Sequence, residues 1–165
     1  MEEKSSIRST ELISMMSFQP RKYHYKTRIK WTQNDEGETS TEGNPPIQIA
    51  LPENLGGPGG SWSPDELFVS SAEACAMLTF FWLLKDKDVE VISYESEAEG
   101  VSHIDRDGLF RFTKVTIRPT IIVKREEDIP KVEKAVKKLD DSCCVSNSLK
   151  SQVVIEAKIK VENQK

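Results

Sequence analysis

Residues 63–85 read SPDELFVSSAEACAMLTFFWLLK, and this stretch decides the fold. It begins with the start signals of a helix: Ser63 is typical of an N-cap, Pro64 of the first helical position, and Glu66 completes a capping box. The residues that follow are largely apolar. We therefore predict one long helix from Pro64 to about Lys85, buried in the core of the protein.

Two cysteines fall on the apolar stripes of two separate predicted helices. Helical spacing places Cys75 on one stripe with Leu67, Ser71, Ala74, Leu78 and Trp82. A second helix is predicted from residue 128 to about residue 142, and its stripe ends on Cys143 after Ile129, Val132, Val136 and Leu139. Both thiols are expected to face inward. If the helices line one core, the thiols could meet, either as inert packing residues or as a redox couple.

Strand-like segments surround the two helices. They are residues 23–31, 47–51, 89–97, 109–123 and 153–161, with a hairpin turn at 105–108. Residues 34–37 are predicted to form a turn, residues 52–60 a Gly-rich loop, and residues 1–21 a polar extension. This order of elements predicts a β-rich α+β fold.

Composition limits the class of protein. A chain of 165 residues, 37% of them hydrophobic, is expected to form one domain with a real core. The net charge of −4 and the absence of a basic stripe in the sequence argue against nucleic-acid binding, because nothing would neutralise the phosphates. The longest apolar run, residues 74–84, is too short to cross a bilayer, and the first twenty residues lack the apolar segment of a secretory signal. A chain with three cysteines and no expected export signal is typical of a reducing compartment, so the cytoplasm is the expected location.

Three motifs resemble those of the OsmC/Ohr family (osmotically inducible protein C-like and organic hydroperoxide resistance-like) of thiol-dependent hydroperoxide reductases. They are Ser-Pro-Asp-Glu-Leu-Phe ahead of Ala-Cys75, Cys143-Cys144-Val-Ser-Asn-Ser-Leu, and the Gly-rich stretch at 52–60. Their order agrees with the family over residues 23–161. The resemblance implies a single OsmC-like domain over residues 22–165, with curved antiparallel sheets around two main helices, in an intertwined homodimer.

The resemblance also implies roles for two cysteines. In the family the first cysteine attacks the peroxide as a thiolate and the second captures the resulting sulfenic acid as a disulfide, which makes Cys75 the peroxidatic residue and Cys143 the resolving one. An external dithiol, in many relatives a lipoylated protein, would reopen the disulfide. No cofactor is implied. His24 and His103 are not at ligand spacing from the cysteines, so we expect no metal.

Cys144 is a departure from the family, because it occupies the position where relatives usually have proline. A vicinal disulfide with Cys143 would be strained, since adjacent Cα atoms lie about 3.8 Å apart and disulfides usually need about 4.4 Å or more. On a continuous helix, residue 144 also points about 100° away from the stripe that contains Cys143. We therefore expect a packing residue, with a regulatory thiol as the alternative.

Relatives pair a glutamate of the first motif with an arginine that holds the attacking thiolate. Asp65 matches that glutamate, although the helix dipole alone would favour an acid there. About 15 Å of helix separates Asp65 from Cys75, so we expect Asp65 to act on a second chain or through a bridging arginine. The family's loop arginine has no counterpart here, and Arg28 and Arg111 are spare candidates. Without a cation, a buried Cys75 thiol would have a raised pKa.

Three functions remain open. The first is a two-cysteine peroxidase acting on organic or fatty acid hydroperoxides, which the apolar residues around Cys75 favour, although ordinary core packing explains those residues equally well. The second is an OsmC-like protein that binds an apolar or thiol ligand without turnover, which the absent arginine favours. The third is a thiol redox sensor that uses Cys75, Cys143 and Cys144.

Overall fold

The computed structural model describes residues 21–162, and the extension expected over residues 1–21 therefore lies almost entirely outside the described residues. A long hairpin forms the framework. Strand β4 (Val91–Ile104) pairs antiparallel with β5 (Phe110–Val123), from Val91 opposite Val123 to Ile104 opposite Phe110, with register shifts between Val91 and Ser93 and between Val101 and Ser102. The predicted hairpin is confirmed, and its first strand runs on to Ile104, past the expected end at residue 97.

The predicted C-terminal strand is present as two short strands. Both β6 (Gln152–Ile155) and β7 (Lys158–Val161) pair with β5, and both run parallel to it. Between them the amide of Glu156 donates to the carbonyl of Ile117 at 2.8 Å, so the chain stays along β5 through the break. The central strand β5 is accordingly the most buried, and its inward residues form much of the core.

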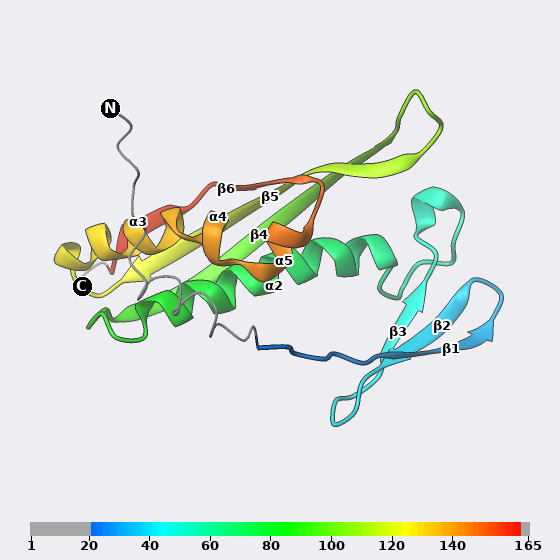
Figure 1. Cartoon of the computed structure of the whole chain (residues 1–165), viewed down its shortest axis with the longest axis horizontal. Helices are drawn as coiled ribbons and strands as arrows, with labels where there is room; N and C mark the ends of the chain where they lie inside the picture. Colours follow the sequence, from blue (N-terminus) through cyan, green and yellow to red (C-terminus); the bar gives the residue numbers. More distant parts are fainter. Residues whose placement is uncertain (1–20, 163–165) are drawn as a thin grey trace, which may run out of the picture.

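A separate three-stranded sheet precedes the first long helix. It contains β1 (Arg28–Gln33), β2 (Glu36–Ser40) and β3 (Ile47–Ala50) in that order, all antiparallel. Strand β1 begins later than expected, and the predicted turn shortens to residues 34–35, with Asn34 at a φ of 41°. The sequence analysis missed β2 because its residues, EGETS, carry no apolar alternation. Figure 1 shows this sheet beyond the N-terminal end of the long helix, apart from the β4–β5 hairpin.

The Gly-rich loop connects the small sheet to the long helix. It contains the 3-10 helix η1 (Glu53–Leu55) and folds back so that the Gly57 amide donates to the Pro52 carbonyl at 3.1 Å. A Cβ atom at Gly57 would collide with the carbonyl of Leu51, so glycine is required at this close approach.

The long helix, α2 (Pro64–Leu84), begins and ends almost where predicted. Its capping box is formed: the Ser63 hydroxyl accepts from the Glu66 amide at 3.1 Å, and the Glu66 carboxylate accepts from the Ser63 amide at 2.7 Å. The predicted inner stripe, however, is wrong. The buried residues are Ala72, Ala76, Phe80 and Leu84, whereas Ser71, Ala74, Leu78 and Trp82 are exposed. Periodicity could not select the face because apolar residues surround the helix on all sides.

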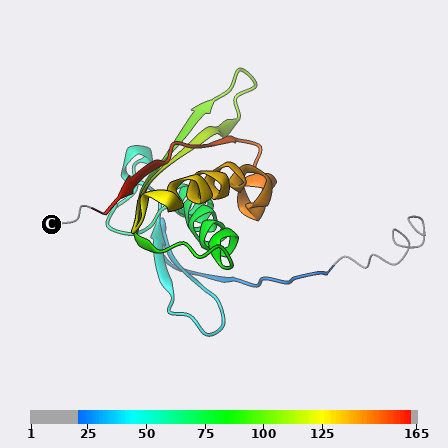
Figure 2. The ribbon, with the colours of Figure 1, turned by 90° about the vertical axis from the view of Figure 1, so that its left-hand side faces the viewer.

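By length and composition α2 could also cross a membrane, which the shorter run at 74–84 did not suggest. In this fold it instead packs against β4, β5 and α3 (Ile129–Lys137). Figure 2, an end-on view, shows α2 and α3 side by side on the same side of the main sheet.

The second predicted helix is interrupted. The segment divides into η2 (Glu126–Asp128), α3, α4 (Leu139–Ser142) and α5 (Cys144–Ser148). Asp128 is fully buried at the start of α3, where its carboxylate accepts from Arg125 Nε at 2.9 Å and Lys131 Nζ at 3.0 Å. The predicted inner stripe holds: Val132, Leu139 and Cys143 are buried, and Ile129 and Val136 are partly buried.

Two clusters of buried side chains make up the core. One joins α2 to α3, α4 and β5 through Phe80, Leu84, Ile121, Val123, Val132, Ala135 and Leu139. The other lies under the middle of α2, where Ala72 and Ala76 meet Val115 and Ile117, with Val145 and Leu149 packed against them. Since Val145 belongs to α5 and Leu149 follows it, this second cluster holds α5 next to the turn of α2 that contains Cys75.

Candidate functional site

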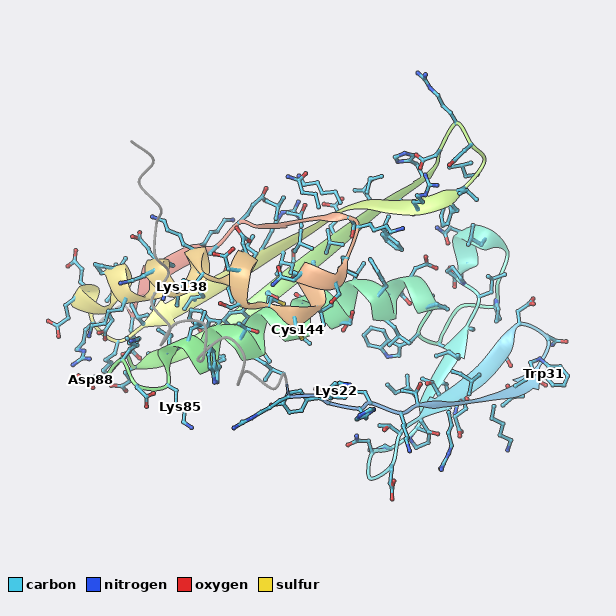
Figure 3. The ribbon with its side chains drawn as sticks, in the orientation of Figure 1. Lys22, Trp31, Lys85, Asp88, Lys138 and Cys144 are labelled. Carbon is cyan, nitrogen blue, oxygen red and sulfur yellow. The ribbon has the colours of Figure 1, made fainter. Side chains whose placement is uncertain are left out.

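The three cysteines gather where α5 crosses α2. Cys75 is half-buried in the middle of α2. Its Sγ lies 3.9 Å from the Sγ of Cys144 and 3.9 Å from Oγ1 of Thr79, one helical turn further along. Figure 3 shows Cys144 on α5 beside α2. The expected partner of Cys75 was Cys143, and the sulfur contact found at 3.9 Å is with Cys144, the next residue.

Cys143 occupies the break between α4 and α5. It ends α4 and caps α5 with extended backbone angles (φ −81°, ψ 109°), and its side chain has no solvent exposure. The Ser146 hydroxyl donates to its Sγ at 3.2 Å. Because residue 143 is extended rather than helical, the two consecutive cysteines can both approach Cys75 from one corner.

The expectation that Cys144 is a packing residue is wrong. Cys144 is exposed, and its thiol contacts Cys75. The 100° rotation argued for a continuous helix does not apply, because the helix ends at Ser142 and a new one starts at Cys144.

Hydrogen bonds lower the pKa of Cys75 below its ordinary value. Burial is the largest single influence and would raise the pKa. It is outweighed by hydrogen bonds to the sulfur from the Cys143 thiol, the Val145 amide, the Cys144 thiol and the Thr79 hydroxyl. The pKa of Cys143 is raised by burial and by its contact with Cys75, and that of Cys144 is raised by hydrogen bonding to Cys75. Of the three thiols, Cys75 therefore ionises most readily.

This result corrects the expectation of a raised pKa for Cys75 without a cation. Among residues 21–162, no arginine or lysine is hydrogen-bonded to Cys75. The donors that stabilise the thiolate are thiols, a hydroxyl and a backbone amide. Arg111 is engaged elsewhere, pairing with Asp105 and, at 2.7 Å, with Asp107 near the tip of the β4–β5 hairpin. Arg28 lies exposed at the start of β1.

Asp65 is not brought to Cys75 within one chain. It is half-buried in the first turn of α2 and lines a cavity of about 780 Å³ between α2, the Gly-rich loop and the β4–β5 hairpin. The acids Glu53, Glu66 and Glu73 also line this cavity, and Cys75 does not. A catalytic role for Asp65, through a second chain or a bridging arginine, stays a prediction.

The described part of the chain holds no group of three or more His, Cys, Asp or Glu residues arranged to bind a metal ion. His103 bonds to Asp105 at 2.7 Å in the hairpin, and His24 is exposed before β1. Neither histidine belongs to the thiol cluster.

Sequence reasoning missed three groups of this site. Thr79 follows Cys75 by four residues on a predicted helix, so helical spacing could have identified it. Ser146 follows Cys143 by three residues, but its contact depends on the break before α5. The Val145 amide is a tertiary donor that no side-chain pattern reveals.

Comparisons with known proteins agree with this fold. The family model described as OsmC-like protein matches residues 57–158, more than half of the chain. An uncharacterized protein of Bacillus subtilis, YmaD, is 26% identical over 145 residues, which cover 85% of this chain and 95% of that protein.

Solved structures show the same architecture. An OsmC-like protein of unknown function from Vibrio cholerae superimposes with a TM-score of 0.76 at 19% identity, covering 83% of this chain and all of the other. An organic hydroperoxide resistance protein from Elizabethkingia anophelis has a TM-score of 0.63 at 21% identity, covering 88% of this chain and all of the other. These similarities and the family match lead to one conclusion: the chain belongs to the OsmC-like family.

Proposed function

We propose that this protein is a thiol-dependent peroxidase that reduces organic or fatty acid hydroperoxides. The observation that carries the proposal is the thiol cluster, in which the Cys75 sulfur lies 3.9 Å from that of Cys144 and its pKa is lowered, while the pKa values of Cys143 and Cys144 are raised. A thiolate is the nucleophile of peroxide reduction, and a neighbouring thiol is what captures the sulfenic acid before it oxidises further. Family membership supports the same chemistry, since the Elizabethkingia relative is named for organic hydroperoxide resistance.

The reaction has two steps. The Cys75 thiolate attacks the outer oxygen of the hydroperoxide, the O–O bond breaks, and the alkoxide takes a proton and leaves as an alcohol, which gives Cys75 sulfenic acid. The Cys143 thiol then attacks the sulfenic sulfur, forming the Cys75–Cys143 disulfide and releasing water. Burial and contact with the Cys75 thiolate raise the pKa of Cys143 in the reduced protein. The sulfenic acid carries no charge, so the contribution of the thiolate disappears after the first step and Cys143 loses its proton more readily for the attack. An external dithiol, such as the dihydrolipoyl group of a lipoylated protein, then reduces the disulfide.

The apolar surface near Cys75 supports a hydrocarbon-bearing substrate. Leu78, Phe81 and Trp82 follow Cys75 on α2 and are 64%, 41% and 69% exposed. Such side chains offer apolar contact to an alkyl or aryl hydroperoxide and none to hydrogen peroxide. We therefore propose a preference for organic hydroperoxides.

The exposed apolar side chains of α2, together with a second exposed apolar group around β1, also support a homodimer. Beyond α2, the largest exposed apolar side chains include Tyr23, Tyr25, Ile29 and Trp31, on β1 and the segment before it. Apolar surface of this kind usually marks an interface, and a second copy of the chain would cover it and could bring Asp65 to the partner's thiol cluster. For thiols that must remain reducible, we propose the cytoplasm as the location.

The test is peroxide consumption with cumene hydroperoxide or hydrogen peroxide and a dithiol reductant. We expect turnover to be faster with cumene hydroperoxide than with hydrogen peroxide, to be abolished by Cys75→Ser, and to be slowed by Cys143→Ser, which lacks the proposed resolving thiol. A matched control is Ser71→Ala, because Ser71 is exposed and lies one turn before Cys75 on α2. Wild-type turnover no faster than that of the free dithiol would contradict the proposal.

A second candidate function is ligand binding without turnover. The specific observation in its favour is that no described arginine or lysine is bonded to Cys75, while a cavity of about 780 Å³ lies along α2. Unchanged cumene hydroperoxide together with saturable binding of an apolar fluorescent probe would favour this function over the peroxidase. A redox-sensor role would instead show one oxidation per thiol pair without sustained turnover.

A further inference from the structure

Cys144 differs from Cys143 in access. The Cys143 side chain has no solvent exposure, whereas Cys144 is exposed, and both reach Cys75 from the same corner. A reductant must approach one sulfur of a disulfide along the line of the bond, so access to a sulfur governs how fast the disulfide is reopened. A disulfide between Cys75 and Cys143 would present one fully buried sulfur and one half-buried sulfur to the external dithiol.

We propose that Cys144 is a third redox-active cysteine, which takes over the disulfide from Cys143 and presents it to the external reductant. The inference rests on the proposed function for its oxidant and its dithiol. The observation that carries it is the 3.9 Å contact between the Cys75 and Cys144 sulfur atoms, combined with the exposure of Cys144. The two sulfurs need to approach by about 2 Å to reach bonding distance, a movement that side-chain rotation of an exposed cysteine supplies.

The step is a thiol–disulfide exchange, in which no net oxidation occurs. The Cys144 thiolate attacks the Cys75 sulfur of the Cys75–Cys143 disulfide, the new Cys75–Cys144 bond forms, and the old bond breaks. Its electron pair leaves on the Cys143 sulfur, which takes up the proton that Cys144 released. The Ser146 hydroxyl, which donates to the Cys143 sulfur at 3.2 Å, is placed to stabilise that leaving thiolate. One thiolate of the external dithiol then attacks the exposed Cys144 sulfur, and Cys75 leaves as the thiolate. The second thiol of the dithiol breaks the resulting mixed disulfide, which releases Cys144 as a thiol and leaves the reductant as its own disulfide.

The charge on Cys75 controls how readily Cys144 ionises. In the reduced protein the neighbouring Cys75 thiolate raises the pKa of Cys144, which keeps Cys144 protonated as a hydrogen-bond donor. Once Cys75 is part of a disulfide it carries no charge, so this cause of the raised pKa disappears and Cys144 ionises more readily. Cys144 is thus a better nucleophile once Cys75 has been oxidised than in the reduced protein.

The experiment separates oxidation from reduction. Wild type, Cys144→Ser and Cys143→Ser are oxidised in one arm with diamide, which forms disulfides without peroxide, and in the other with one equivalent of cumene hydroperoxide. Fragment-ion mass spectrometry of the linked peptides distinguishes the adjacent residues 143 and 144. The rate of re-reduction by dihydrolipoamide is then measured. Cys144→Ala is a second variant at this exposed position, and Lys150→Ser is a matched exposed control just beyond α5.

We expect oxidised wild type to contain a Cys75–Cys144 disulfide. Re-reduction should be slowed about tenfold or more in both Cys144 variants. In Cys143→Ser and Lys150→Ser it should proceed near the wild-type rate. Wild type that contains only the Cys75–Cys143 disulfide, or a Cys144→Ser protein reduced at the wild-type rate, would overturn the inference. If the diamide arm behaves as expected while cumene hydroperoxide leaves the thiols unoxidised, the peroxidase proposal fails and the exchange through Cys144 stands.

Discussion

Trp82 offers a quantitative test of the proposed homodimer. It projects from the C-terminal half of α2 and is 69% exposed in the single chain. Taking ~250 Å² for a fully accessible tryptophan, about 170 Å² is available to be covered by a partner. At ~25 cal/mol per Å² this corresponds to about 4 kcal/mol for complete covering, and about 2 kcal/mol if half of the side chain is covered.

A twofold dimer contains this side chain twice. Even if only half of each Trp82 side chain is covered, Trp82→Ser should therefore weaken the dimer by about 4 kcal/mol. This corresponds to a roughly thousandfold increase in the dissociation constant. Sedimentation velocity across a dilution series measures this shift. Because Trp82 is exposed in the folded chain, thermal unfolding followed by circular dichroism should show that the protomer itself remains folded.

The matched control is Ile104→Ser, since Ile104 is 68% exposed at the end of β4, away from α2. It should leave the dissociation constant close to that of wild type. A wild-type protein that is monomeric throughout the series, or a Trp82→Ser dimer as tight as wild type, would refute the reasoning that a second copy covers the exposed face of α2.

Three further predictions concern the thiol and the fold. Alkylation of Cys75 by iodoacetamide, followed by peptide mass spectrometry, should have its pH midpoint below that of an ordinary cysteine, because hydrogen bonds lower its pKa and the thiolate persists as the pH falls; a midpoint at or above the ordinary value would contradict this. Ser63→Ala should reduce the free energy of unfolding in urea by about 1 kcal/mol, since it removes the N-cap of α2, and an unchanged midpoint would argue against the capping box. Ile117→Ala, at a fully buried position in β5, should cost about 3 kcal/mol, whereas Ile104→Ala in the exposed hairpin should cost far less; equal losses would place the core elsewhere.

Much of the fold could be predicted from local signals. The start of α2 was predictable because the capping box from Ser63 to Glu66 acts within one turn of helix. The β4–β5 hairpin was predictable because its strands flank a turn-forming segment ending in Gly108. Strand β2 was not predictable, since it forms through pairing with β1 and β3 and its own residues have no strand pattern.

The burial of α2 shows where periodicity fails. Apolar residues lie on every side of the helix, so spacing alone assigned Leu78 and Trp82 to the core and left Ala72 and Ala76 out of it. The small alanines are buried because the helix lies close against β5 at that point, where Val115 and Ile117 meet them. Such a close approach is a property of the packed elements and has no signature in one helix.

The thiol site divides in the same way. By itself the sequence determined that Cys75 lies in the middle of a long helix and that the stripe leading to Cys143 is buried, because both depend on signals within one segment. Only the tertiary structure decided the rest: the break at Cys143 turns Cys144 toward Cys75, and α5 adds the Val145 amide to the donors around that sulfur. These donors lower the pKa of a half-buried thiol without a cation, since a hydrogen bond to a thiolate depends on where segments far apart in the chain come together.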